Sequence, residues 1–265
     1  MKPVVRLLLV GLGAGALTLG AQTTYTDNFS TNSGYWEADV TALGGAFVRN
    51  GVLNFTDAGL STSQTSYAHR DFSLPASASG NWQVQVDLTL AVPSPAIGQF
   101  TMWSLYASAL TSATPEDYVV MELNQNYMQT GWRILNTTQY TNGSTVDSAN
   151  LGSLTPGTIA LQIAYNAAAQ TLTLGYDADG PANSYVFTPL DTADISAWAV
   201  TASDQFGFRL QGSNSTNAFV APALLAGESQ ADNFSLTVAA VPEPAAATVL
   251  LGAVVLLVAS RRRAG

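Results

Sequence analysis

Paired carboxylates are the first chemistry to look for in this sequence, because acidic residues at alternate positions of a strand share one face. Glu122 is the acid within an alternating, strand-like segment at residues 118–125. The same-face positions that follow it hold Asn124 and Asn126 instead of carboxylates. Cleavage of a glycosidic bond uses two carboxyl groups about 5 to 9.5 Å apart. The sequence therefore predicts no glycosidase pair at Glu122, which we expect to pair with Arg133 on the next strand.

Aromatic and polar side chains could together form a surface for a ligand such as a sugar, in which flat rings cover apolar faces and polar groups bind hydroxyls. The candidates for ligand contact are Trp103, Glu122, Asn124, Trp132 and Arg133. Aromatic residues are also common in strands and in cores, so a core role stays open for the two tryptophans of this set. We expect Trp36 and Trp82 to lie in the core.

The peptide Asp-Asn-Phe-Ser occurs twice, at residues 27–30 and at residues 232–235. In a closed sandwich the first and last strands can pair, which would bury Phe29 and Phe234. Asp27 and Asp232 would then be neighbours and could share a structural calcium ion, since calcium binds several oxygen ligands. Alternatively, each aspartate caps a turn. The sequence indicates no other cofactor.

Cysteine and histidine chemistry is almost absent from the chain, which has no cysteine and one histidine, His69. This composition excludes disulfides and thiolate metal sites, and it makes a zinc site improbable because zinc sites are built mainly from His and Cys. Hydrolysis by a serine nucleophile is disfavoured as well, because His69 is the one imidazole base and no Gly-x-Ser-x-Gly motif occurs.

Charge is distributed unevenly along the chain, which has nine Lys and Arg, eighteen Asp and Glu, and a net charge of −9. Five of the basic residues lie near the two ends, at Lys2, Arg6 and Arg261 to Arg263. The middle keeps four arginines against seventeen acidic residues, a difference of −13 charges. Proteins that bind nucleic acid carry basic surfaces, so this balance excludes nucleic acid as a partner.

Short alternating segments fill the middle of the chain. In residues 82–90 every even position is apolar, which is the period-two pattern of a half-buried strand. Similar segments, separated by Gly, Asn, Asp, Ser and Pro, lie at residues 118–125, 132–138, 159–165, 171–176, 206–211 and 234–238. This pattern predicts one all-β domain at residues 22–240, an antiparallel β-sandwich of the jelly-roll kind.

The first 21 residues have the three parts of a secretory signal peptide. Basic Lys2 and Arg6 precede an apolar run at residues 7–19, and small Gly20 and Ala21 follow it. The segment predicts a signal helix, export of the protein, and cleavage after Gly20 or Ala21. The absence of a following cysteine excludes a lipid-anchored leader.

The last 25 residues predict a membrane anchor. Residues 245–260 carry no charge and would span about 24 Å as a helix, slightly less than a bilayer core. A buried core helix is the alternative. Arg261, Arg262 and Arg263 favour a transmembrane helix, because a basic cluster beside a span stays in the cytoplasm and leaves the body outside it.

Residues 241–265 also resemble a known sorting signal. Pro242, Glu243 and Pro244 precede the apolar segment and the arginine cluster, and this order resembles the PEP-CTERM signal of Gram-negative bacteria that make extracellular polysaccharide. The resemblance implies recognition by an exosortase, a membrane enzyme that processes the tail near this motif. It implies nothing about the fold of the body.

The body itself resembles the concanavalin A-like lectin and glucanase sandwiches and the laminin-G-like sandwiches. The resemblance rests on Trp36, a hairpin at residues 50–55 and the closing strand at Asp232. We expect a membrane-anchored protein that reaches the cell surface or the extracellular matrix of a biofilm after tail processing. Its body would be a non-enzymatic binding or structural module for exopolysaccharide. The alternatives are a glycoside hydrolase or lyase of the concanavalin A-like type, and a purely structural coat protein.

Overall fold

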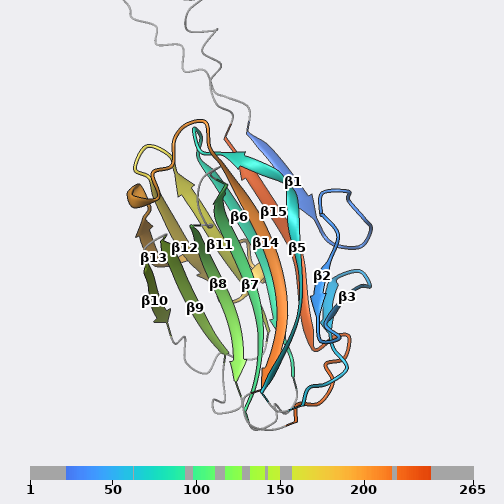
Figure 1. Cartoon of the computed structure of the whole chain (residues 1–265). Coiled ribbons are helices and arrows are strands. Elements are labelled where there is room, and N and C mark those ends of the chain that lie inside the picture. The colour runs from blue at the N-terminus through green and yellow to red at the C-terminus, as the bar shows by residue number, and fades with distance from the viewer. Residues whose placement is uncertain are drawn as a thin grey trace, which may run out of the picture. The chain divides into compact units, whose positions relative to one another are not determined.

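Two antiparallel sheets packed face to face form the body of the protein (Figure 1). The computed structural model describes residues 22–61, 63–92, 98–110, 117–126, 132–140, 143–149, 157–216 and 220–239. Residues Gln22–Ala239 form one compact unit. The predicted signal peptide, sorting motif and membrane span lie outside the described residues. Within the described ranges, no helix has the length and apolar character needed to span a bilayer.

The first sheet has eight strands. Its spatial order is β13 (Thr188–Asp194), β12 (Thr171–Asp177), β11 (Thr158–Asn166), β6 (Trp82–Leu90), β15 (Ser229–Val238), β4 (Leu53–Thr56) and β3 (Ala46–Arg49), and β1 (Thr23–Asp27) also pairs with β15. Two short 3₁₀ helices, η1 (Gly180–Ala182) and η2 (Ser196–Trp198), flank β13 along the chain.

The second sheet has seven strands. Its spatial order is β10 (Gly143–Ala149), β9 (Trp132–Tyr140), β8 (Tyr118–Asn126), β7 (Gln99–Leu110), β14 (Gln205–Thr216), β5 (Gln64–Ser77) and β2 (Val40–Ala42). The predicted all-β antiparallel sandwich is therefore confirmed, whereas the helices predicted at both ends stay predictions.

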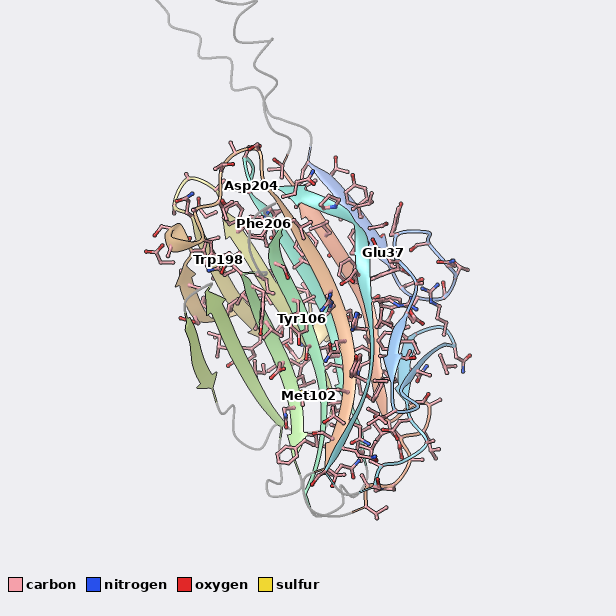
Figure 2. The ribbon with its side chains drawn as sticks, viewed as in Figure 1. Glu37, Met102, Tyr106, Trp198, Asp204 and Phe206 are labelled. Carbon is pink, nitrogen blue, oxygen red and sulfur yellow. The ribbon has the colours of Figure 1, made fainter. Side chains whose placement is uncertain are left out.

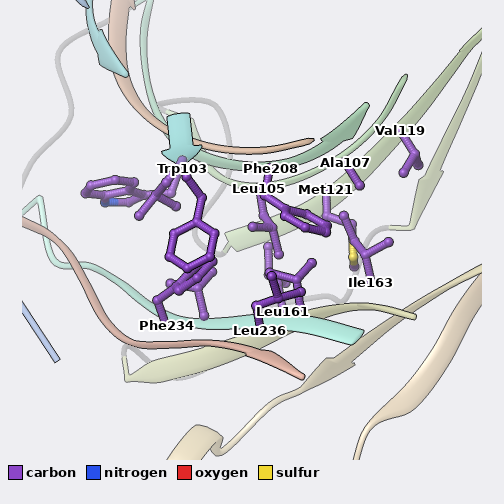
Figure 3. Close-up of a cluster of buried hydrophobic side chains, with 14 of the residues drawn as sticks. Trp103, Leu105, Ala107, Val119, Met121, Leu161, Ile163, Phe208, Phe234 and Leu236 are labelled. Atoms are coloured by element: carbon purple, nitrogen blue, oxygen red, sulfur yellow. The ribbon is translucent and has the colours of Figure 1, made fainter. Parts of the chain in front are cut away.

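The core lies between the two sheets and is built from alternate residues of each strand. Along β6 the side chains of Val84, Val86 and Leu88 are fully buried, as the period-two pattern predicts. Figure 3 shows how residues of the seven-stranded sheet, such as Leu105 and Met121, face residues of the eight-stranded sheet. The alternation that buries one face of each strand exposes the other, and this fixes which residues can meet a ligand.

The first and last strands of the body pair, as the repeated peptides predict. Thr23 lies opposite Val238 and Asp27 lies opposite Phe234 in the β1–β15 register. Phe29 and Phe234 are both buried, with 0% and 1% of their surface exposed. They pack on the ring of Trp36 at centroid distances of 5.7 and 4.7 Å, so the predicted core position of this tryptophan is confirmed.

A buried carboxylate, Asp57, joins the two sheets at one end of the sandwich. Its Oδ2 atom accepts hydrogen bonds from Ser66 Oγ at 2.7 Å and from Asn214 Nδ2 at 2.8 Å. Its Oδ1 atom accepts the backbone N–H groups of Gly59 and Leu224, at 2.9 and 3.1 Å. One side chain thus connects β5 and β14 of the seven-stranded sheet with two loops.

Replacing Asp57 by alanine should lower the free energy of unfolding by about 3 kcal/mol, because buried donors then lose their acceptor. Urea denaturation of residues 22–239 would measure this change. Asp204→Ala is the matched control, since Asp204 accepts two hydrogen bonds from Thr201 in an exposed turn. We expect the control to lose no more than about 1 kcal/mol. Equal losses in both variants would contradict a connecting role for Asp57.

Candidate functional site

The outward side chains of β5, β14, β7 and β8 form the surface that we call the outer face. Strand register places them in rows that cross the sheet. One row contains Glu122, Ser104, Gln211 and His69. The next row contains Val120, Tyr106, Arg209 and Asp71. Figure 2 shows Tyr106 and Met102 along β7 and Glu37 beside β5. Residues far apart in the sequence thus form one continuous surface.

Aromatic rings and an ion pair cross the outer face as a stripe. The rings of Tyr118 and Tyr106 lie 5.7 Å apart between centroids. The guanidinium of Arg209 lies 6.0 Å from the centre of the Tyr106 ring, in the range of a cation–π contact. Arg209 Nε donates a hydrogen bond to Asp71 Oδ1 at 2.7 Å. This stripe of Tyr118, Tyr106, Arg209 and Asp71 offers flat rings beside fixed polar groups.

A pocket of about 220 Å³ lies beside the stripe. It is lined by Glu37, Asp71, Phe72, Ser108, Leu110, Gly207, Phe208 and Arg209. Gly207 lies where the β14–β5 register shifts between Phe206 and Phe208. A Cβ atom there would come within 3.2 Å of the Leu110 side chain, which also lines the pocket.

Glu122 lies on the outer face in a partly desolvated position. Ser104 Oγ donates a hydrogen bond to Glu122 Oε1 at 3.3 Å. Desolvation raises the pKa of Glu122, and the hydrogen bond from Ser104 opposes that rise. Burial and the nearby charge of Glu122 also raise the pKa of Tyr106 to about 12. Glu122 and Tyr106 are therefore electrostatic neighbours on this surface.

The imidazole ring of His69 stacks on the ring of Tyr67. The two rings are 5.8 Å apart and nearly parallel, with 7° between their planes. Burial, together with the positive charge of Arg209, lowers the pKa of His69. The imidazole is therefore mainly uncharged at neutral pH and adds a second flat patch to the outer face.

The five predicted ligand contacts do not all lie on one surface of the structure. Glu122 and Asn124 both belong to the outer face, although Asn124 is only 7% exposed. Trp132 and Arg133 begin β9, and their side chains lie outside the described part of the structure. The register places Leu135 opposite Glu122, and Arg133 opposite Asn124. The predicted Glu122–Arg133 pair is therefore diagonal in the backbone.

Trp103 requires a correction, because it points into the core. Its surface is fully buried, and its indole stacks on Phe47 with 5.6 Å between centroids and parallel planes. The residue lies on the inward face of β7, so it cannot contact a ligand on the outer face.

A second catalytic carboxylate is not positioned near Glu122 on the described outer face. Asp71 lies three strands away, on β5, which corresponds to about 14 Å of sheet. Carboxyl pairs that hydrolyse glycosidic bonds are about 5 to 9.5 Å apart. The surface has groups that can bind a ligand, but its acids lack the spacing of a glycosidase.

Asp27 lies opposite Phe234 in the β1–β15 register, two residues along β15 from Asp232, and its charge contributes to the raised pKa of Asp232 after the larger effect of burial. Both oxygens of Asp27 already accept hydrogen bonds, Oδ1 from the Phe29 N–H and Oδ2 from Ser33 Oγ and Trp36 Nε1. Among the residues with described positions, no group of three or more His, Asp or Glu side chains could hold a metal ion. The contacts of Asp27 fit the turn-capping alternative.

The sequence analysis did not predict that the residues of the stripe lie together. Tyr106 and Arg209 are 103 positions apart, and Asp71 precedes Tyr106 by another 35, so no local motif connects them. The signal that could have found them is alternation within residues 99–110, where Trp103, Leu105 and Ala107 point inward. Outward Phe100, Met102 and Tyr106 are themselves apolar or aromatic, which concealed the pattern.

Plant lectins are among the solved structures that are similar to this chain. Lectin II from Ulex europaeus matches with a TM-score of 0.52 and 9% identity, over 82% of this chain and 98% of that chain. The lectin UEA-II complexed with galactose matches with a TM-score of 0.53 and 11% identity, over the same shares. At these identities the likeness shows the fold alone, a concanavalin A-like sandwich. No protein-family model and no curated protein matches the chain, so the sorting signal stays a prediction.

Replacing Glu122 by glutamine should stabilise the protein at neutral pH and not at acidic pH. The raised pKa means that the folded state holds the proton more tightly than the unfolded chain does. Ionising Glu122 therefore costs stability as pH rises above the ordinary value of 4.5, and glutamine avoids that cost.

Urea denaturation at pH 3 and pH 7 would measure the effect as the difference between the variant and the wild type. We expect the free energy of unfolding of Glu122→Gln to exceed that of the wild type by more at pH 7 than at pH 3. A difference that is the same at both values would show that Glu122 is not desolvated in the fold.

Proposed function

We propose that this protein is an exported carbohydrate-binding module that holds an uncharged glycan chain on the outer face of its seven-stranded sheet. The observation that carries the proposal is the stripe of Tyr118, Tyr106, Arg209 and Asp71 beside a pocket of about 220 Å³. The likeness in fold to lectins, one of them complexed with galactose, agrees with this function without establishing it.

The chemistry of the stripe suits a sugar chain. A sugar ring presents C–H groups on its faces and hydroxyls around its edge. The rings of Tyr106 and Tyr118 can cover a C–H face, and the charged groups of Arg209 and Asp71 can bind hydroxyls with strong, directed hydrogen bonds. Because these side chains project from adjacent strands of a packed sheet, they need little reordering on binding.

Charge favours an uncharged ligand over an acidic one. Arg209 is neutralised by Asp71, and the lowered pKa of His69 keeps its ring uncharged at neutral pH. Glu37 and Glu122 add negative charge to the same surface. The body around them is strongly acidic, so a polyanionic chain would be repelled.

Binding without turnover follows from the spacing of the acids. Glu122 has Ser104 as its neighbour on β7, and Asp71 is three strands away. A general acid at Glu122 would lack the second carboxylate that hydrolysis uses. The raised pKa of Glu122 is therefore a consequence of desolvation in a binding surface.

The location in which this module acts is proposed from the two ends of the sequence. The signal peptide at residues 1–21 directs export, and residues 241–265 direct sorting by an exosortase and anchoring in the membrane. The body would lie outside the cytoplasm and act at the cell surface or in the matrix, where exopolysaccharide is the available glycan. A sorting tail of this kind places a binding module beside its ligand.

Replacing Tyr106 by alanine should weaken glycan binding about tenfold, since a lost ring contact of about 1.4 kcal/mol changes affinity by that factor. Isothermal titration of residues 22–239 with uncharged glucose and galactose hexasaccharides would measure the loss. Tyr106→Phe keeps the ring and should bind like the wild type. Unchanged affinity in Tyr106→Ala, with the fold intact by circular dichroism, would exclude the stripe as the binding surface.

Replacing Pro242 and Pro244 by alanine should block processing of the tail, because the two prolines keep this segment out of a helix and accessible to an enzyme. The length of the product in a host with an exosortase would be measured by mass spectrometry. Glu228→Ala, in the body, serves as a control that should be processed normally. A normally shortened double-proline variant would contradict sorting at this motif.

A further inference from the structure

A second hollow lies on the opposite side of the sandwich, over the outer surface of the eight-stranded sheet. Its volume is about 590 Å³, within the range of about 300–1,000 Å³ typical of small-molecule sites. We call it the rear groove. Its lining comes from β1, β6, β15 and two loops, and includes Thr26, Asp27, Gln85, Tyr185, Asn233 and Ser235.

The floor of the rear groove is a row of uncharged hydrogen-bonding groups. Thr26 lies opposite Ser235, and Ser235 lies opposite Gln85, so the three side chains project from adjacent strands at one level. Neighbouring strands are about 4.8 Å apart, which spaces these groups regularly. Within the described residues, none of the three side chains has a hydrogen-bond partner. They are available to a ligand.

The carboxylate in the lining, Asp27, already accepts hydrogen bonds from the protein. Both oxygens of Asp27 accept protein donors, from Phe29 N, Ser33 Oγ and Trp36 Nε1. The groove therefore offers hydroxyls and amides and no available cation. Asp232 lies nearby, with a pKa raised by burial and by the charge of Asp27, and its negative charge disfavours an anionic ligand.

An aromatic wall of the rear groove is held in position by a buried carboxylate. Asp87 is 2% exposed, and its Oδ2 atom accepts Tyr185 Oη at 2.9 Å and Asn233 Nδ2 at 2.8 Å. Both donors belong to the lining, so Asp87 is a positioning residue for the groove. Asp87 Oδ1 is also buried, and it has no hydrogen-bond partner among the described residues. Burying an acceptor without a partner costs free energy of folding. The protein bears this cost at the side chain that positions Tyr185 and Asn233.

From these observations we infer that the rear groove is a second binding site for an uncharged, polyhydroxylated ligand such as a neutral glycan. Its floor presents free hydroxyl and amide groups, and the Tyr185 ring supplies a flat wall. The stripe and the rear groove lie on the outer surfaces of different sheets. If the proposed function holds for the stripe, one folded body then carries two glycan sites and can cross-link two chains.

The test uses residues 22–239, which contain both sheets and the whole described core. The probes are uncharged hexasaccharides of β-1,3-glucose, β-1,4-glucose and β-1,4-galactose, with hexagalacturonate as the anionic comparison. Isothermal titration gives the number of sites, and turbidity of a neutral polymer of the same linkage reports cross-linking. The wild type should bind two equivalents of an uncharged probe, bind hexagalacturonate more weakly, and cloud the polymer.

Ser235→Trp fills the groove from an outward position of β15 and should remove one of the two binding events, lowering its affinity at least about tenfold. Thr173→Trp is the matched control, on the outer surface of the same sheet but three strands away. It should keep both events and the turbidity. Tyr185→Ala removes the wall without filling the groove, so it tests the site even if Ser235→Trp folds poorly.

The outcomes separate this inference from the proposed function. If Ser235→Trp and Tyr185→Ala both behave like Thr173→Trp, the rear groove is not a site, whereas a loss in Tyr106→Ala would still support the stripe. If the groove variants abolish binding and Tyr106→Ala does not, the stripe fails and the groove stands. If the wild type binds none of the probes, both are overturned.

Discussion

Burial of alternate side chains between two sheets is the constraint on which the rest of this structure depends. Val84, Val86 and Leu88 of β6 face Leu105 and Met121 across the core, and a slip of one residue in any strand would turn that strand's apolar set toward water. The apolar pattern therefore fixes which side of each strand faces the core and, together with the turns, the register of neighbouring strands. Once the register is fixed, the cross-strand neighbours of each outward residue are fixed as well. The rows of outward residues across each sheet follow from this.

The functional surfaces are consequences of those rows. On the seven-stranded sheet the row of Tyr106, Arg209 and Asp71 places a ring, a cation and an anion on three adjacent strands. On the eight-stranded sheet the row of Thr26, Ser235 and Gln85 places three uncharged polar groups side by side. The first row is already bonded within itself by an ion pair and a cation–π contact, whereas the second is open. The two surfaces therefore differ in chemistry, because the first pairs opposite charges and the second presents uncharged polar groups.

Much of the fold could be predicted, but the sites could not. The strand at Trp82–Leu90 was predicted with its observed bounds, because polar and apolar residues alternate there without exception. The strand at Gln64–Ser77 lacks this simple alternation, because its buried positions include Arg70. Arg70 pairs with Asp39, and its guanidinium lies 5.2 Å from the centre of the Phe47 ring. Trp103 was a candidate ligand contact with a core role left open, because composition alone does not say which face of a strand a tryptophan occupies. The prediction that the first and last strands pair and bury Phe29 and Phe234 was correct.

The sequence by itself determined the class of the fold, the acidic character of the body, the absence of cysteine chemistry and the two terminal segments that we interpret as export and sorting signals. These are properties of composition and of short-range pattern, which need no knowledge of which strands are neighbours. Only the tertiary structure decided that Asp71, Tyr106 and Arg209 form one stripe, that Trp103 is buried, and that Asp87 holds Tyr185 beside a groove. The physical reason is that strand pairing joins segments separated by tens to more than a hundred residues, and the free energy that selects those pairs comes from the whole core.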